Sequence, residues 1–143
     1  MLRSTCLFAL ACVLSVVSMD PSIQAADDHA DHFMKCAKVC ADCQLECDSC
    51  FHHCLMLLGE GKKEHEKTAQ LCSDCAECCK TCSTLCARKS PLAGPMLDCC
   101  IKACEECGAA CEKFPDDKHM AQCAKVCRDC AKHCTEMRKN LGK

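Results

Sequence analysis

The chain has 143 residues, a formal net charge of −2 and 23 cysteines, but it contains neither tryptophan nor tyrosine. This length is sufficient for one domain with a core, and the nearly balanced charge, without a basic block or an aromatic platform, argues against nucleic-acid binding. The cysteines are the unusual feature of this composition, so their spacing is the best guide to fold and function.

The first 25 residues have the pattern of a secretory signal peptide. Arg3 supplies a short positive region, and the apolar run from Leu7 to Val17 is too short to span a bilayer comfortably. The segment Ile-Gln-Ala at 23–25 is an acceptable cleavage site. A lipoprotein signal ending at Cys12 and a retained membrane anchor are the alternatives for this segment.

The sequence thus predicts a signal peptide at 1–25, a mature domain at 26–143, and export to the periplasm or cell envelope of a bacterium. Because Cys6 and Cys12 leave with the signal peptide, 21 of the 23 cysteines stay in the mature chain. No later segment is apolar enough to span a membrane.

The first predicted helix runs from about residue 29 to residue 58 and ends at Gly59 and Gly61. Its six cysteines are spaced alternately by four and three residues, as are the a and d positions of a heptad, so they lie along one stripe. A helix normally fills such a stripe with leucine, isoleucine or valine. Here the stripe consists of Cys36, Cys40, Cys43, Cys47, Cys50 and Cys54.

The same spacing recurs in three further predicted helices. The second runs from about residue 62 to residue 89, and the third begins near Pro95, because proline is tolerated in the first turn of a helix. The fourth follows a break at 114–117, where an aspartate can cap it, and ends near Gly142. The stripes are Cys72, Cys75, Cys79, Cys82 and Cys86; Cys100, Cys104, Cys107 and Cys111; and Cys123, Cys127, Cys130 and Cys134. Cys78 and Cys99 lie one position beside their stripes.

Four helices joined by short connections predict an all-α protein, an antiparallel up-down-up-down four-helix bundle. The four cysteine stripes must face one another, because the helices have no other apolar face. The predicted core of the bundle is therefore lined by thiols.

Cysteine can serve as a small core hydrophobe, but the composition argues against this interpretation. The predicted mature chain has nine leucines, one isoleucine and two valines against 21 cysteines. Replacing leucine by cysteine throughout a core would remove burial worth ~0.8 kcal/mol for each lost CH₂.

A disulfide or redox scaffold protein is a second interpretation. Cysteines three or four apart on one helix have Cβ atoms ~5–6 Å apart, beyond the ~3.5–4.5 Å of a disulfide, although bridges between helices are feasible. The number 21 is odd, and disulfide-dense domains are usually loop-rich. This interpretation predicts few free thiols in the metal-free protein.

Thiolates also select Cu(I), Zn(II) or iron–sulfur clusters, and the last prefer compact loop spacings over a helical ladder. A zinc site with four thiolates has a net charge of −2, so several stacked sites would bury much charge. Cu(I) is monovalent, and about one ion per thiolate gives a neutral core. The pattern favours multiple Cu(I) ions per chain and leaves a zinc-buffering, metallothionein-like protein as the alternative.

With C-x₃-C-x₂-C-x₃-C runs on every helix, the chain resembles the bacterial copper storage proteins over essentially the whole predicted mature domain. The resemblance implies a protein that stores Cu(I) and is not an enzyme, with the 19 in-register cysteines as ligands and with Cys78 and Cys99 as less regular members of the set. It also implies a homotetramer and, for exported members, copper supply to recipient cuproenzymes such as methane monooxygenase. The sequence departs from those exported members in having Arg3 alone where they carry a twin-arginine signal.

Methionine and histidine at the ends of the bundle are candidate ligands for incoming copper. Extension of the stripes places His65 and Met120 inward, at the end where the first and third connections lie, and they form the predicted uptake site. At the opposite end it places His29, Phe33 and Met137 inward, with Met96 beside the stripe. The remaining histidines are predicted to lie on the solvated surface: His32, His52, His53, His119 and His133.

Overall fold

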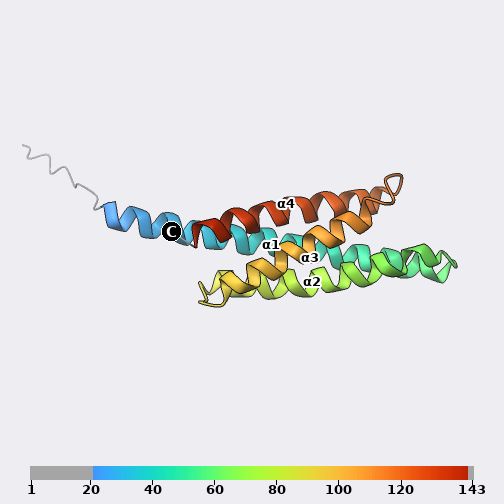
Figure 1. Cartoon of the computed structure of the whole chain (residues 1–143), viewed down its shortest axis with the longest axis horizontal. Coiled ribbons are helices and arrows are strands. Elements are labelled where there is room, and N and C mark those ends of the chain that lie inside the picture. Colours follow the sequence, from blue (N-terminus) through green and yellow to red (C-terminus); the bar gives the residue numbers. More distant parts are fainter. Residues whose placement is uncertain (1–20, 142–143) are drawn as a thin grey trace, which may run out of the picture.

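The structure, a computed structural model, describes the backbone of residues 21–141 and the side chains of residues 31–141. Within this range the chain is almost entirely helical (Figure 1). Its elements are α1 (Pro21–Gly59), the short 3₁₀ helix η1 (Lys63–His65), α2 (Glu66–Ala87), α3 (Ala93–Cys111) and α4 (Lys118–Asn140). None of the described helices is long and apolar enough to cross a membrane.

The four α-helices form a closed ring around one core. Each helix packs against the next one in sequence, and α4 packs against α1. The diagonal helices α1 and α3 meet through thiols in the core, where the Sγ atoms of Cys43 and Cys104 are 3.9 Å apart. The α1–α2 and α3–α4 connections lie at one end of the bundle and the α2–α3 connection lies at the other (Figure 1). The predicted antiparallel up-down-up-down bundle is confirmed.

The helix boundaries differ from the predicted ones at three starts. α1 begins at Pro21 rather than near residue 29, because proline fits the first helical position and no breaker follows it. It therefore runs through the predicted cleavage site at 23–25, whereas residues 1–20 of the predicted signal peptide lie outside the described residues.

The second and third helices also start elsewhere. After Gly61, whose φ of 86° suits a residue without a side chain, η1 forms one tight turn before α2 begins at Glu66. α3 begins at Ala93, so that Pro95 is its third residue, where a backbone N–H has no partner within the helix. The predicted aspartate cap of the fourth helix is confirmed: Asp117 accepts hydrogen bonds from the backbone N–H groups of His119 (2.9 Å) and Met120 (3.2 Å).

Cysteine fills the core. All 19 in-register cysteines are buried. The other buried apolar side chains among the described residues are alanines, Leu97, Met120 and Met137. The stripes therefore face one another as the spacing predicts, and small alanine side chains lie beside them where the helices pack.

Candidate metal centre

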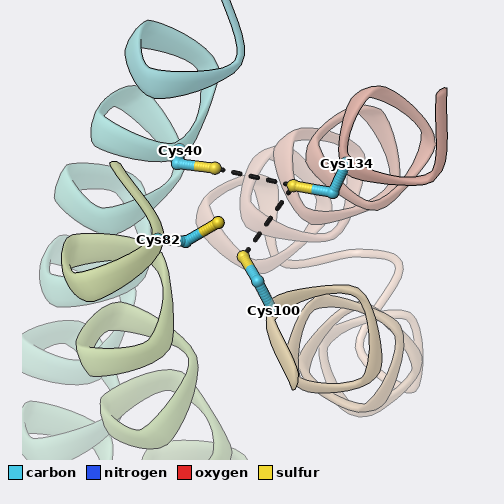
Figure 2. Close-up of side chains that lie close together, drawn as sticks. All are labelled: Cys40, Cys82, Cys100 and Cys134. Carbon is cyan, nitrogen blue, oxygen red and sulfur yellow. Dashed lines mark hydrogen bonds between the residues drawn. The ribbon is translucent and has the colours of Figure 1, made fainter. Parts of the chain in front are cut away.

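The cysteines of the four helices meet in layers across the bundle. In one layer the Sγ atoms of Cys40 (α1), Cys82 (α2), Cys100 (α3) and Cys134 (α4) lie within 4.8 Å of one another (Figure 2). The Sγ atoms of Cys40 and Cys134 are 3.5 Å apart, and those of Cys134 and Cys100 are 3.9 Å apart. A layer of this kind arises because each helix presents one thiol at the same height.

Four more groups of four thiols follow along the bundle. They are Cys43, Cys79, Cys104 and Cys130; Cys43, Cys47, Cys75 and Cys127; Cys47, Cys107, Cys123 and Cys127; and Cys50, Cys72, Cys111 and Cys123. Four cysteines each belong to two of these groups: Cys43, Cys47, Cys123 and Cys127. Shared cysteines therefore join these four groups, and the 3.6 Å contact between the Sγ atoms of Cys79 and Cys100 joins the Cys40 layer to them. The sulfurs form one continuous column rather than separate cages.

The thiols touch without being bonded to one another. All 21 described cysteines are free, and the shortest sulfur–sulfur contacts between core helices, Cys40 to Cys134 and Cys47 to Cys127, are 3.5 Å, against ~2.05 Å for a disulfide. Neighbours on one helix are also close, since the Sγ atoms of Cys43 and Cys47 are 4.0 Å apart. A metal ion can thus reach thiols of the same helix and of adjacent helices at once.

Hydrogen bonds between sulfurs shift the thiol pKa values in opposite directions. Hydrogen bonds with Cys100 and Cys130 raise the pKa of Cys40, whereas a hydrogen bond with Cys104 lowers the pKa of Cys43. At the end of the column, hydrogen bonds with Cys50 and Cys72 lower the pKa of Cys54 to about 4. Neighbouring thiols of the column therefore differ in how readily they release a proton, and a cation that binds the thiolates replaces those protons.

His65 and Met120 are buried beside the Cys54 end of the column, as the register predicts. The His65 ring packs on Phe114, with ring centroids 4.2 Å apart, and its Nδ1 atom has no hydrogen-bond partner among the described residues. A groove of about 370 Å³, lined in part by His65, Phe114 and Leu57, opens to the solvent there. The geometry offers a buried nitrogen and a buried thioether close to an opening, although their role as ligands stays a prediction.

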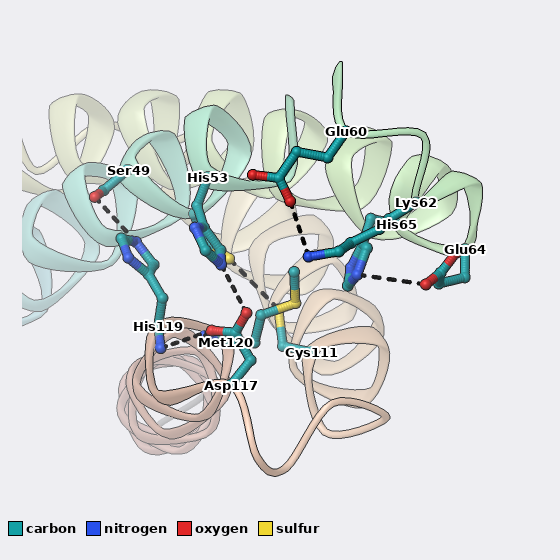
Figure 3. Close-up of polar contacts among 11 residues, drawn as sticks. Ser49, His53, Glu60, Lys62, Glu64, His65, Cys111, Asp117, His119 and Met120 are labelled. Carbon is teal, nitrogen blue, oxygen red and sulfur yellow. Dashed lines mark hydrogen bonds and ion pairs between the residues drawn. The ribbon is translucent and has the colours of Figure 1, made fainter. Parts of the chain in front are cut away.

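Two histidines at this end are not the solvated side chains that the sequence predicts. His53 and His119 are half-buried and stack, with ring centroids 4.7 Å apart. The His53 Nε2–H donates to Asp117 Oδ2 at 2.7 Å, and His119 Nε2 lies 3.1 Å from Ser49 Oγ (Figure 3). Helical periodicity does not predict this cluster, because the cluster joins α1 to the start of α4. Its only signal in the sequence is the potential of Asp117 as a helix cap.

The other histidines and the side chains at the opposite end of the bundle agree with the sequence predictions only in part. His32 and His52 are exposed as predicted, whereas His133 is half-buried. At the opposite end of the bundle Met137 is buried, and Phe33 and Met96 pack partly buried against the core, while the His29 side chain lies outside the described residues.

Cys78 and Cys99 do not belong to the column. Cys99 is exposed and Cys78 is half-buried, and their Sγ atoms lie 3.7 Å apart. Burial and a hydrogen bond with Cys99 raise the pKa of Cys78 to about 12. The pair is therefore a separate feature on the outside of the bundle.

A closed four-helix bundle with a continuous thiol interior defines a thiolate metal-binding protein of the storage type. The family described as copper storage protein matches residues 29–139, and the chain belongs to this family. A comparison with curated proteins gave no match.

A solved structure with the same fold is described as copper loading to a cytosolic copper storage protein from Streptomyces lividans, with five coppers. The TM-score is 0.72 at 23% sequence identity, over 79% of this chain and 97% of that chain. This comparison corrects the predicted location in the periplasm or cell envelope: the structural relative is cytosolic, and the predicted export is not retained.

Proposed function

We propose that this protein stores Cu(I) on its 19 buried cysteines and that it acts as a store rather than an enzyme. The observation that carries the proposal is the continuous column, in which four of the five four-thiol groups are joined by shared cysteines and the fifth by a sulfur contact. Soft thiolates prefer Cu(I), and a thiolate shared between groups can bridge two such ions.

The shared cysteines favour copper over zinc. The five groups are made from only 16 different cysteines, so five independent tetrahedral sites cannot be filled at once. Each zinc tetrathiolate would also leave a buried charge of −2, whereas about one Cu(I) per thiolate leaves the column neutral. Uncompensated charge inside a closed bundle is costly, so the geometry supports a chain of bridged monovalent ions.

Copper reaches the column at the end that contains His65 and Met120. His65 Nδ1 has no hydrogen-bond partner among the described residues, and His65 lines the solvent-facing groove. This nitrogen and the buried Met120 thioether are the donors offered to Cu(I) at this end. Replacing His65 by alanine should slow Cu(I) uptake without changing the final copper content, and His52→Ala, at an exposed position of α1, is the matched control. Equal uptake rates for the two variants would contradict this route.

We expect the chain to form a homo-oligomer, a tetramer by family resemblance. We also expect a separate partner protein that delivers copper to the store or receives copper from it. The family match and the spacing of the thiols, whose Sγ atoms lie within 4.8 Å of one another in each group, support the storage role.

The test of the storage function uses the reduced full chain under anaerobic conditions. Titration with Cu(I) against a coloured Cu(I) chelator should show about one ion bound per buried thiolate, and Cu(I) should displace Zn(II). Protein extracted from copper-supplemented cells should contain copper. Few free thiols in the metal-free chain would instead identify a disulfide scaffold, and retention of zinc against Cu(I) would identify a zinc buffer.

A further inference from the structure

The two cysteines outside the column face each other across the seam between α2 and α3. Cys78 precedes Cys79 and Cys99 precedes Cys100, and the inner pair Cys79–Cys100 has its own Sγ contact of 3.6 Å. Adjacent residues on a helix point about 100° apart. Because α2 and α3 are antiparallel, a step back along each chain turns both side chains toward the same outer side of the seam, and the outer Sγ atoms meet at 3.7 Å.

The pair offers two sulfur ligands and no others. No third histidine, cysteine, aspartate or glutamate among the described residues completes a metal-binding group with Cys78 and Cys99. A structural zinc site requires four ligands, so the pair does not suit zinc. Of the ions that select thiolates, Cu(I) is the one that two thiolates satisfy.

The sulfur separation also fits a two-coordinate ion better than a disulfide. In a linear S–Cu–S arrangement the sulfurs stand about 4.6 Å apart, which is twice a metal–thiolate bond of about 2.3 Å. The pair must open by less than about 1 Å to reach that separation from 3.7 Å. A disulfide would require the sulfurs to close to ~2.05 Å, a larger movement between two packed helices.

We propose that Cys78 and Cys99 bind one Cu(I) in a two-coordinate site on the outside of the bundle, from which copper exchanges with dissolved Cu(I) ligands. The choice of ion rests on the proposed storage function. On binding, the two thiols release two protons to water, and Cu(I) forms two Cu–S bonds to give a bis-thiolate complex with a charge of −1.

Exposure sets the order in which copper leaves the protein. Cys99 is exposed, so a chelator can attack the outer copper directly, whereas the core cysteines are buried and surrounded by helices. Copper on the outer pair should therefore be the first to be removed. Copper at this outer site therefore exchanges rapidly, whereas copper in the column exchanges slowly.

The test compares the copper-loaded full chain with two double variants, mixing each rapidly with an excess of a coloured Cu(I) chelator. Cys78→Ser/Cys99→Ser removes the outer pair, and Cys79→Ser/Cys100→Ser, one residue along each helix, is the matched control. The outer variant should lose the fastest phase of copper release, about one ion per chain, while the inner variant keeps that phase and loses slowly released copper. A fast phase of full amplitude in the outer variant would overturn the proposal.

Alkylation provides a second readout that does not depend on rates. Bound copper should protect Cys78 and Cys99 of the wild-type chain from iodoacetamide, and the first equivalent removed by the chelator should expose them. Equal labelling with and without copper would overturn the outer site, as would blockage that only a reductant relieves, because that marks a disulfide. Failure of the storage function would give a different result, because the wild-type chain would then hold no copper on its core cysteines.

Discussion

The sharing of cysteines between groups can be tested by removing two thiols at a time. Cys47 and Cys127 lie 3.5 Å apart and belong together to two four-thiol groups, whereas Cys40 and Cys134, also 3.5 Å apart, belong to one. Both pairs join α1 to α4 and all four side chains are fully buried. The serine double variants of these pairs are therefore matched in the helices they join, in the separation of their sulfurs and in burial.

The two models of the core predict different copper losses. If each thiolate held its own ion, both double variants would lose about two ions. If the ions are held by bridged groups, Cys47→Ser/Cys127→Ser removes two ligands from each of two groups and should lose more than two ions, whereas Cys40→Ser/Cys134→Ser removes two ligands from one group and should lose about two. The effects on the metal-free bundle should be similar, because each variant buries two hydroxyls at a cost of about 1–3 kcal/mol each when they lack a partner.

The assay is an anaerobic Cu(I) titration against a competing chelator, with circular dichroism and denaturant unfolding of the metal-free variants as the control for folding. Equal copper losses in two folded variants of similar stability would refute the bridged column. A larger loss for the Cys40 and Cys134 variant would refute the assignment of the shared positions.

Five further outcomes are expected. Asp117→Ala should lower the free energy of unfolding of the metal-free chain by about 1 kcal/mol in denaturant unfolding, because α4 loses its N-cap. Partial burial raises the pKa of Asp117, but the hydrogen bond from His53 and those from the backbone outweigh it and hold the pKa below its usual range. The stability from this depressed pKa is present above about pH 4 and is lost as the pH falls through the folded-state pKa, so Asp117→Asn should flatten the acid limb of a stability-versus-pH curve. A Cβ at Gly108 would lie 3.2 Å from Arg128 Nε, which is a tight contact. Gly108→Ala should therefore raise the free energy of unfolding by the full helix-propensity gain of about 1 kcal/mol only when it is combined with Arg128→Ala. A double-mutant cycle would measure this coupling. Copper should raise the unfolding temperature in a thermal melt, and copper content should fall on acidification because protons compete for the thiolates.

The spacing of the cysteines was enough to predict the helices, their inward faces and the bundle. Side-chain direction on a helix repeats every 3.6 residues, so Cys36 and Cys54 had to lie on one stripe wherever the helix was placed. The same reasoning put His65 and Met120 inside, and the structure buries both. The direction of each side chain depends only on geometry within one helix, and the bundle followed because four such stripes joined by short connections must face one another.

Tertiary structure decided which sulfurs meet. The sharing of Cys47 and Cys127 between groups, and the outer contact of Cys78 with Cys99, depend on how far neighbouring helices are shifted along their axes. The stacking of His53 on His119 likewise depends on where the turn before α4 places Asp117. Helical periodicity determines in which direction a side chain points, but the axial offset between helices is set by connections and packing, and only that offset brings residues of different helices to one height.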